Sequence, residues 1–211
     1  MVDDGAERRF GPQDGGGQVV ASMSMSLDGF VEDRDGGVGE VFAWCQQGDH
    51  VTTAPGDGRE FRTSRATAEL LREAWAGTGA VVCGRRLFDL THGWGGSHPL
   101  GVPVFVVTHS TPTGWAHPEA PFTFVVTGGV AAAVAAARDA AGSRTVAIAS
   151  PDVARQCLDL GLLDAIAVDL VPVILGAGKP WFAGAAVTTR LEGPRITPGD
   201  GVTHLFYDVQ R

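Results

Sequence analysis

The sequence has few cysteines, no excess of positive charge and no long hydrophobic run. Its three cysteines, Cys45, Cys83 and Cys157, are far apart in 211 residues and match neither a metal-binding spacing nor an even set of disulfides. They predict a reduced, cytoplasmic protein, and the apolar or helical surroundings of Cys83 and Cys157 predict that these two thiols are buried and inert. The net charge of -8 and the isoelectric point near 5.1 argue against a nucleic-acid partner or an anionic membrane surface.

Several functional patterns are missing as well. No apolar stretch reaches the length of a membrane span, and the N-terminus lacks the charged-then-apolar pattern of a signal peptide. The six histidines form no HxH or HExxH motif, and no serine lies in a GxSxG elbow. The HxE…PCxxC pattern of zinc deaminases is also absent. We therefore expect no metal site and no deaminase domain.

The chain divides into a short leader and one domain. Residues 1–17 are rich in glycine and charge, which predicts a disordered leader. Residues 18–211 are long enough to form one domain with a large core. Seven segments are predicted as strands: 19–25, 80–83, 102–107, 122–126, 145–149, 165–174 and 203–209. Four are predicted as helices: 64–75, 85–90, 130–141 and 153–160.

The alternation of strands and helices determines the predicted fold class. It is typical of an α/β fold with a mostly parallel central sheet and helices on both faces. The final strand follows without a clear helix, so we expect an antiparallel strand at the edge of the sheet. Residues 50–59 carry proline and glycine and predict a mobile loop.

Glycines, hydroxyl groups and cations follow the predicted strands at the point where each strand ends. In chain order they are Gly84, Arg85 and Arg86; Thr108 and His109; Ser150, Asp152 and Val153 at a helix start; and Gly176, Gly178 and Lys179. The carboxyl ends of parallel strands meet at one edge of a sheet, and helix N-termini at that edge attract phosphate. The pattern therefore predicts a nucleotide cofactor with more than one phosphate group.

Each of these features also has an ordinary structural explanation. Glycine after a strand is common turn chemistry, and a pair of arginines at a helix start is often a solvated surface. Serine or aspartate at a helix start is a common N-cap. The prediction therefore depends on the features occurring together.

Residues 160–182, LGLLDAIAVDLVPVILGAGKPWF, join a G-L-x-D motif, an apolar strand and the pattern P-V-x-L-G-x-G-x-x-x-F. This stretch resembles the RibD C-terminal domain family of dihydrofolate-reductase-like proteins, which use NADPH. VVCGRRLFD at 81–89 resembles the family's cofactor-binding G-R-x-T-[FWY] segment, with Leu87 in place of threonine. ASMSMSLDGF at 21–30 resembles its first strand and the S-x-D-G-x turn that borders the nicotinamide, which implies that Ser26, Asp28 and Gly29 bind the cofactor.

The resemblance covers the chain from about residue 19 and implies both a fold and an activity. The fold would be dihydrofolate-reductase-like, and the protein a homodimer. A second reason to expect a homodimer is the apolar strand at 205–209, whose pairing partner the sequence does not reveal. It would transfer hydride from NADPH to a C=N or C=O bond of a small heterocyclic substrate. Gly84, Arg85 and Arg86 would bind phosphate. One departure is Ala149-Ser150, followed by Pro151-Asp152, where the family has Gly-Gly against the pyrophosphate.

The sequence leaves two alternative functions open and the catalytic acid unassigned. The departure at Ala149-Ser150 also fits a non-catalytic nucleotide-binding or regulatory protein on the same fold, and a scaffold-only dimer is a third possibility. The sequence assigns no catalytic acid. Five aspartates are candidates by location: Asp28, Asp33, Asp35, Asp49 and Asp57.

Overall fold

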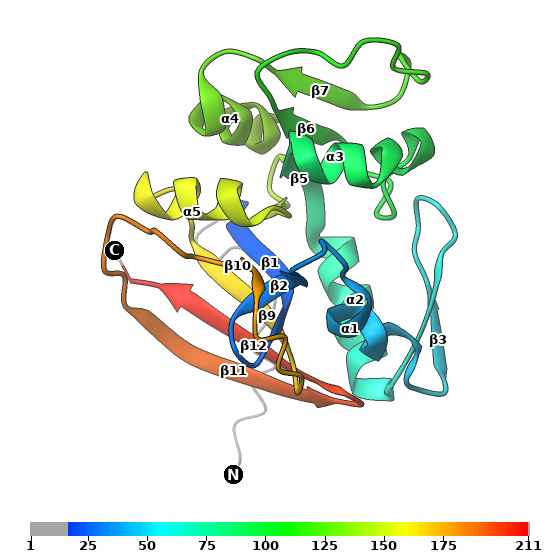
Figure 1. Ribbon diagram of the computed structural model, residues 1–211. Coiled ribbons are helices and arrows are strands. Elements are labelled where there is room, and N and C mark those ends of the chain that lie inside the picture. The colour runs from blue at the N-terminus through cyan, green and yellow to red at the C-terminus, as the bar shows by residue number, and fades with distance from the viewer. Residues whose placement is uncertain (1–16, 211) are drawn as a thin grey trace.

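The computed structural model describes residues 17–210 and is built around one eight-stranded sheet (Figure 1). The strands lie in the order β11-β12-β9-β1-β8-β5-β6-β7. Their bounds are β1 Val19–Ser26, β5 Thr78–Gly84, β6 Val104–Val107, β7 Phe122–Val125, β8 Thr145–Ile148, β9 Ala165–Val171, β11 Leu191–Gly199 and β12 Val202–Val209. The predicted leader, apart from Gly17, lies outside the described residues.

The sheet is mostly parallel, as the sequence predicts. Strands β1, β5, β6, β7, β8 and β9 run parallel to their neighbours, whereas β12 pairs antiparallel with β9 and β11 pairs antiparallel with β12. The antiparallel edge strand is therefore confirmed, but it is β11 and not the final strand. Residues 203–209 have a pairing partner on each side.

Helices cover both faces of the sheet. The bounds are α1 Gly39–Phe42, α2 Arg65–Gly77, α3 Arg85–Leu90, α4 Gly129–Ala141 and α5 Pro151–Asp159, with 3-10 turns η1 Ala43–Gln46 and η2 His92–Gly96. Side chains of α4 and α5 pack in one core with Val19, Ala21 and Ile148. The opposite face carries α2 and α3 (Figure 1).

Strand β1 shows how the sequence alternates between these faces. Val19 and Ala21 belong to the core under α4 and α5, and Met23 packs against it. Ser22 and Ser24 point to the opposite face, because successive side chains of a strand alternate. Small serines leave room there, and this face is hollowed beside α2.

Two smaller two-stranded sheets complete the fold. Strand β2 (Phe30–Asp33) pairs antiparallel with β10 (Gly178–Pro180), and β3 (His50–Thr53) pairs with β4 (Glu60–Thr63). The second pair corrects the prediction of a mobile loop at residues 50–59. Pro55, Gly56 and Gly58 form only the turn of this hairpin, which β-branched residues flank.

The predicted start of the second helix is confirmed. Ser64 is the N-cap of α2, and its hydroxyl accepts a hydrogen bond from the Thr67 amide at 3.2 Å. Such a cap satisfies one of the free N–H groups at the helix start. It fixes the end of α2 that carries Thr67 against the sheet.

Candidate functional site

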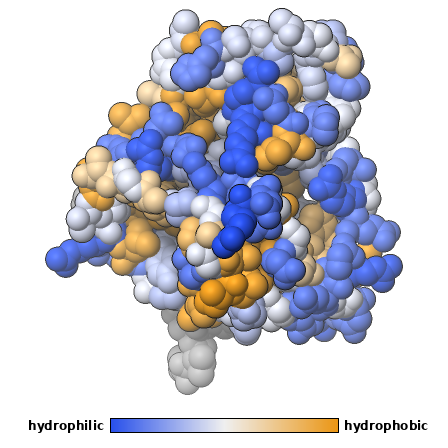
Figure 2. Space-filling view, viewed as in Figure 1, coloured by the Kyte–Doolittle hydropathy of each residue, from blue (hydrophilic) through white to orange (hydrophobic). Residues whose placement is uncertain are grey.

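The structure brings the predicted site residues to one edge of the sheet. They follow the carboxyl ends of β9, β1, β8, β5 and β6, which are consecutive neighbours in the sheet order. Hydrophilic side chains run down the middle of this face, from the region of α3 to that of β2 and β10 (Figure 2). The loops therefore form a continuous polar row that crosses five strands.

Asp28 joins the loop after β1 to the loop after β9. Its carboxylate accepts hydrogen bonds from the amides of Leu175 at 3.1 Å and Gly176 at 2.7 Å. The Ser26 hydroxyl donates to the same carboxylate at 2.7 Å. The hydroxyl of Ser26, followed by these amides, lowers the pKa of Asp28 below its ordinary value. The ionised carboxylate therefore holds the two loops together.

The two glycines of the loop after β9 have different surroundings. At Gly178, with φ of 152°, a Cβ would overlap the backbone carbonyl of Glu32, because β10 lies against β2 there. The strand pairing alone accounts for a glycine at this position. At Gly176, with φ of 73°, the space that a Cβ would take is open. The same is true of Gly29, where φ is 91°.

Two ion pairs hold predicted phosphate-binding cations. Lys179, the only lysine of the sequence, places its ammonium 2.9 Å from both carboxylate oxygens of Asp152. Arg86 contacts Glu32 at 2.8 and 3.0 Å, and the Glu32 side chain is only 10% exposed, against 61% for Arg86. These pairs link β10 to α5 and α3 to β2. An anionic ligand would have to compete with these carboxylates.

Arg85 is held on the other side of the row. Its guanidinium bonds to Asp89 at 2.8 Å and donates to the Ser110 carbonyl at 3.0 Å. Thr108 is buried beneath it, and its hydroxyl donates to the same carbonyl at 2.9 Å. His109 is exposed in the loop beyond β6.

Ser150 occupies the junction between β5, β8 and α5. Its hydroxyl accepts a hydrogen bond from the Gly84 amide at 2.9 Å, so this amide already has a partner within the chain. Val153 is buried in the core, and its side chain would lie 3.6 Å from a Cβ placed at Gly84. Only the backbone of Val153 is thus positioned to meet a ligand at the start of α5.

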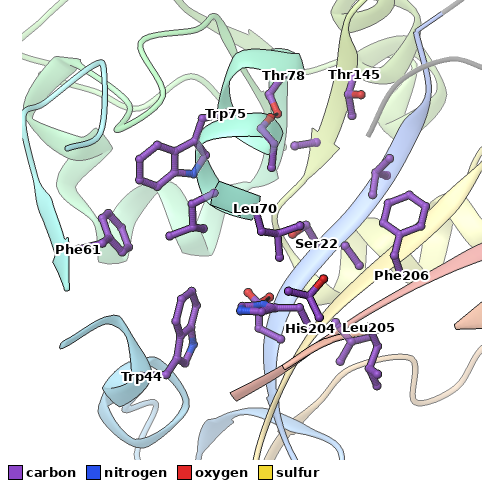
Figure 3. Close-up of a pocket in the computed structure, with 18 of the residues that line it drawn as sticks. Ser22, Trp44, Phe61, Leu70, Trp75, Thr78, Thr145, His204, Leu205 and Phe206 are labelled. Atoms are coloured by element: carbon purple, nitrogen blue, oxygen red, sulfur yellow. Dashed lines mark hydrogen bonds and ion pairs between the residues drawn. The ribbon is translucent and has the colours of Figure 1, made fainter. Parts of the chain in front are cut away.

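A second feature lies on the α2 face of the sheet. It is a cavity of about 240 Å³ between α2, η1 and the strands β1, β9 and β12. Trp44, Phe61 and Trp75 line one side, and Ser22, His204 and Phe206 lie across from them (Figure 3). The walls are thus largely aromatic and apolar.

A chain of polar side chains crosses the floor of this cavity. Thr67 Oγ1 lies 2.9 Å from His204 Nε2, and His204 Nδ1 lies 2.7 Å from Asp169 Oδ1. The second oxygen of Asp169 is 3.4 Å from the Ser24 hydroxyl, which accepts a hydrogen bond from the Trp44 indole at 3.1 Å. The network therefore links α2, η1 and three strands.

Sequence reasoning missed Asp169 and His204. The signal was present, since Asp169 is the only charged residue in β9, a strand that otherwise reads AIAVLV. A charge in a buried strand requires a partner or a function. The five aspartates proposed by location do not line the cavity. Asp33 instead caps its own turn, and Asp49 and Asp57 pair with His50 and Arg59.

Two kinds of site are absent from the part of the chain that the structure describes. Between residues 17 and 210, no group of three or more histidine, cysteine, aspartate or glutamate side chains is arranged to hold a metal ion. None of the helices described is both long and apolar enough to cross a bilayer.

Burial raises the pKa of the Cys45, Cys83 and Cys157 thiols to about 12.

Comparison with solved structures identifies the fold. A protein given as a riboflavin biosynthesis protein, from Shewanella sp. PV-4, is 19% identical, with a TM-score of 0.68, over 92% of this chain and 99% of that one. Dihydrofolate reductase from Enterococcus faecalis, complexed with NADP(H), is 11% identical, with a TM-score of 0.54, over 92% and 97%. The dihydrofolate-reductase-like fold predicted from the sequence is confirmed.

A third structure is longer than this chain. The diaminohydroxyphosphoribosylaminopyrimidine deaminase/5-amino-6-(5-phosphoribosylamino)uracil reductase of Thermotoga maritima is 11% identical, with a TM-score of 0.58. The match covers 92% of this chain and 57% of that one. A comparison with curated protein sequences gives no match.

The sequence profile described as the RibD C-terminal domain matches residues 18–205, which is most of the chain. The match includes the polar row and nearly all of the cavity described above. The chain belongs to the RibD C-terminal domain family.

Proposed function

We propose that this protein is an NADPH-dependent reductase that transfers hydride to a C=N or C=O bond of a small heterocyclic substrate. The observation that carries the proposal is the row of five strand ends, with Arg85, Arg86 and Lys179, in a fold that also holds an aromatic cavity on the α2 face of the same sheet. Family membership supports it, as does the fold shared with a reductase complexed with NADP(H). In open α/β sheets, ligands bind at the carboxyl ends of the strands.

The residues of the row fit a nucleotide with separate phosphate groups. Arg85 and Arg86 would hold the 2′-phosphate, and the start of α5 with Lys179 would face the pyrophosphate. The open sides of Gly29 and Gly176 allow a ligand to approach the backbone closely. Thr108 and His109 would flank the adenosine end.

The chain itself supplies orientation and shelter for the reaction. When bound, NADPH brings the reactive C–H bond. Ser26 and Gly29 would border the nicotinamide, with Asp28 fixing the position of this turn through Leu175 and Gly176. The cavity beside α2 would hold the substrate and exclude water from it.

A second candidate function has its own support. The Gly84 amide is taken by the Ser150 hydroxyl, and Asp152 places a negative charge beside Lys179. The first contact removes an N–H donor, and the second offsets a positive charge, that could otherwise bind a pyrophosphate at this edge. They favour the alternative of a nucleotide-binding or regulatory protein that keeps the fold without efficient turnover.

The setting of the protein also remains a proposal. We propose a cytoplasmic homodimer that acts on a small molecule and binds neither nucleic acid nor membranes. The three buried free cysteines support a cytoplasmic setting. The acidic composition argues against binding to nucleic acid or membranes. The resemblance to the family supports the homodimer.

Affinity measurements on charge variants test the proposed site. Arg86→Ala should weaken NADPH binding about tenfold and leave NADH binding nearly unchanged, because only NADPH carries the 2′-phosphate. Asp152→Asn should strengthen the binding of both cofactors, because it releases Lys179. Arg65→Ala, on the exposed side of α2, is the matched control. Equal effects of Arg86→Ala and Arg65→Ala on NADPH affinity would reject the site.

A further inference from the structure

We propose that Asp169, held in place by His204, is the recognition residue of the cavity beside α2. The cavity would bind a planar heterocycle of one or two rings that donates an N–H hydrogen bond and carries no phosphate group. The inference rests on the proposed function only where it takes this heterocycle to be the substrate that is reduced. The binding site itself is argued from the cavity.

Asp169 is placed to meet a ligand. It lies in β9 directly opposite Ser24 of β1 and lines the cavity, with 26% of its side chain exposed. One oxygen faces His204 at 2.7 Å, whereas the other is 3.4 Å from the Ser24 hydroxyl. A carboxylate offers about four acceptor positions, so this one keeps capacity for a donor in the cavity.

His204 acts on the ligand only through Asp169. Its side chain is 5% exposed, and both ring nitrogens have partners, Asp169 and Thr67. A side chain locked in this way fixes the direction of the carboxylate. His204 is therefore a positioning residue.

The walls determine the shape and charge of the ligand. Trp44, Phe61 and Trp75 offer flat apolar surfaces on which a ring can stack. A volume of about 240 Å³ lies below the roughly 300–1,000 Å³ of typical ligand pockets, which limits the ligand to one or two rings.

Among the described residues, the lining of this cavity offers a phosphate group little positive charge. Arg195, the one arginine in that lining, is bound to Asp208 at 2.8 Å and stacks 4.5 Å over the Phe206 ring, which leaves only its buried Nε–H without a partner. The Asp169 carboxylate would repel a second anion. An N–H donor, neutral or cationic, is instead attracted to it.

Asp169 lies at the end of the cavity that is nearer to the proposed cofactor row. Ser24, opposite Asp169, is two residues before Ser26 on the same face of β1. Two residues of a strand span about 7 Å. A ring bound at Asp169 would thus lie about 7 Å along the sheet from the turn that borders the nicotinamide in the proposed function.

The test uses two probes of nearly equal shape, 2-aminoquinoline and 2-methylquinoline, without NADPH. Only the first donates N–H hydrogen bonds to a carboxylate. Binding is followed by tryptophan fluorescence and calorimetry. Wild-type protein should prefer 2-aminoquinoline at least tenfold. Equal affinity for the two probes, or no binding of either up to about 1 mM, would overturn the inference.

Variants locate the preference in the cavity. Asp169→Asn should remove the preference for 2-aminoquinoline. The affinity for 2-aminoquinoline should fall at least tenfold, while the affinity for 2-methylquinoline should change less than about twofold. Asp139→Asn, an exposed aspartate on α4 across the sheet, is the matched control and should change neither. An unchanged preference in Asp169→Asn would contradict the proposal.

A second pair of variants tests the positioning role. His204→Leu should lower the preference between the probes and keep 2-methylquinoline affinity, whereas His204→Asn, which can still donate to Asp169, should restore most of it. If folded His204→Leu bound neither probe, His204 would have a merely structural role. NADPH affinity is measured separately, so a failure of the cofactor site and a failure of this inference are distinguishable.

Discussion

Replacement of Gly178 by alanine tests how the loop after β9 is built. The new Cβ would overlap the Glu32 carbonyl of the neighbouring strand, and φ at this position is 152°. The overlap involves backbone atoms, so a change of rotamer cannot relieve it. Strands β2 and β10 would have to move apart.

The expected loss of stability follows from these two terms. Overpacking against a fixed neighbour costs about 1–3 kcal/mol, and an unfavourable backbone conformation costs about 1–3 kcal/mol more. The unfolding free energy should therefore fall by roughly 2–6 kcal/mol. At this chain length, that corresponds to a decrease in Tm of about 4–24 °C.

Gly176→Ala is the matched control in the same loop. Its Cβ would enter open space, and only the left-handed φ of 73° is unfavourable. We expect a loss of about 1 kcal/mol, or roughly 2–4 °C in Tm. If the loop contacts NADPH, Gly176→Ala should in addition weaken cofactor binding by about tenfold or more.

Thermal unfolding of the two apo variants, with NADPH titration of each, decides the question. The reasoning requires that Gly178→Ala lose clearly more stability than Gly176→Ala. It would be refuted if Gly178→Ala were as stable as Gly176→Ala. The pairing of β10 with β2 would then not explain the glycine, and direct contact between Gly178 and a ligand would regain support.

Three more predictions concern pH, chain length and assembly. Burial lowers the pKa of His98 to about 4, and its Nδ1 accepts a hydrogen bond from the Leu100 amide, so the ring is neutral in the native protein. The unfolding free energy should therefore fall as the pH drops from about 6.5 to 4, by at most about 3 kcal/mol. In urea unfolding, His98→Gln should flatten this pH dependence. A chain beginning at Gly17, where an added Cβ would overlap the Arg144 carbonyl, should keep its Tm within a few degrees, and a larger drop would show that the leader packs on the domain. Light scattering should show a homodimer, and a monomer at all concentrations would reject that proposal.

The sequence predicts the parts of this fold that have regular hydrophobic patterns. All seven predicted strands form, because each is a short apolar run bounded by turn residues. Strand β11 was missed, since Pro194, Pro198 and Gly193 argue against a strand. These residues are tolerated at an edge, where one side of the strand needs no partner. The β3–β4 hairpin was missed because its turn chemistry was taken for a whole loop.

The homodimer prediction loses one of its two reasons. It used the strand at 205–209, whose pairing partner the sequence does not reveal. The structure pairs this strand with β9 on one side and β11 on the other. The resemblance to the family is the reason that remains.

The clustering of the candidate site residues at one edge of the sheet was predictable, and their contacts with one another were less so. Residues that follow parallel strands must share an edge, which sequence order reveals. Long-range contacts, such as Lys179 with Asp152 or Gly178 with Glu32, depend on how loops meet across the sheet. The pairing of Asp169 with His204 likewise joins strands whose register no local pattern specifies.

Amide hydrogen exchange with and without saturating NADPH tests the central claim most directly. The account predicts slower exchange in the five segments of the row, residues 26–29, 84–86, 108–110, 150–153 and 175–179, with no change in the β3–β4 hairpin. NADH at the same concentration should protect 84–86 less, because it lacks the 2′-phosphate. Unchanged exchange throughout the row, or protection confined to other segments, would contradict the claim that this edge binds NADPH.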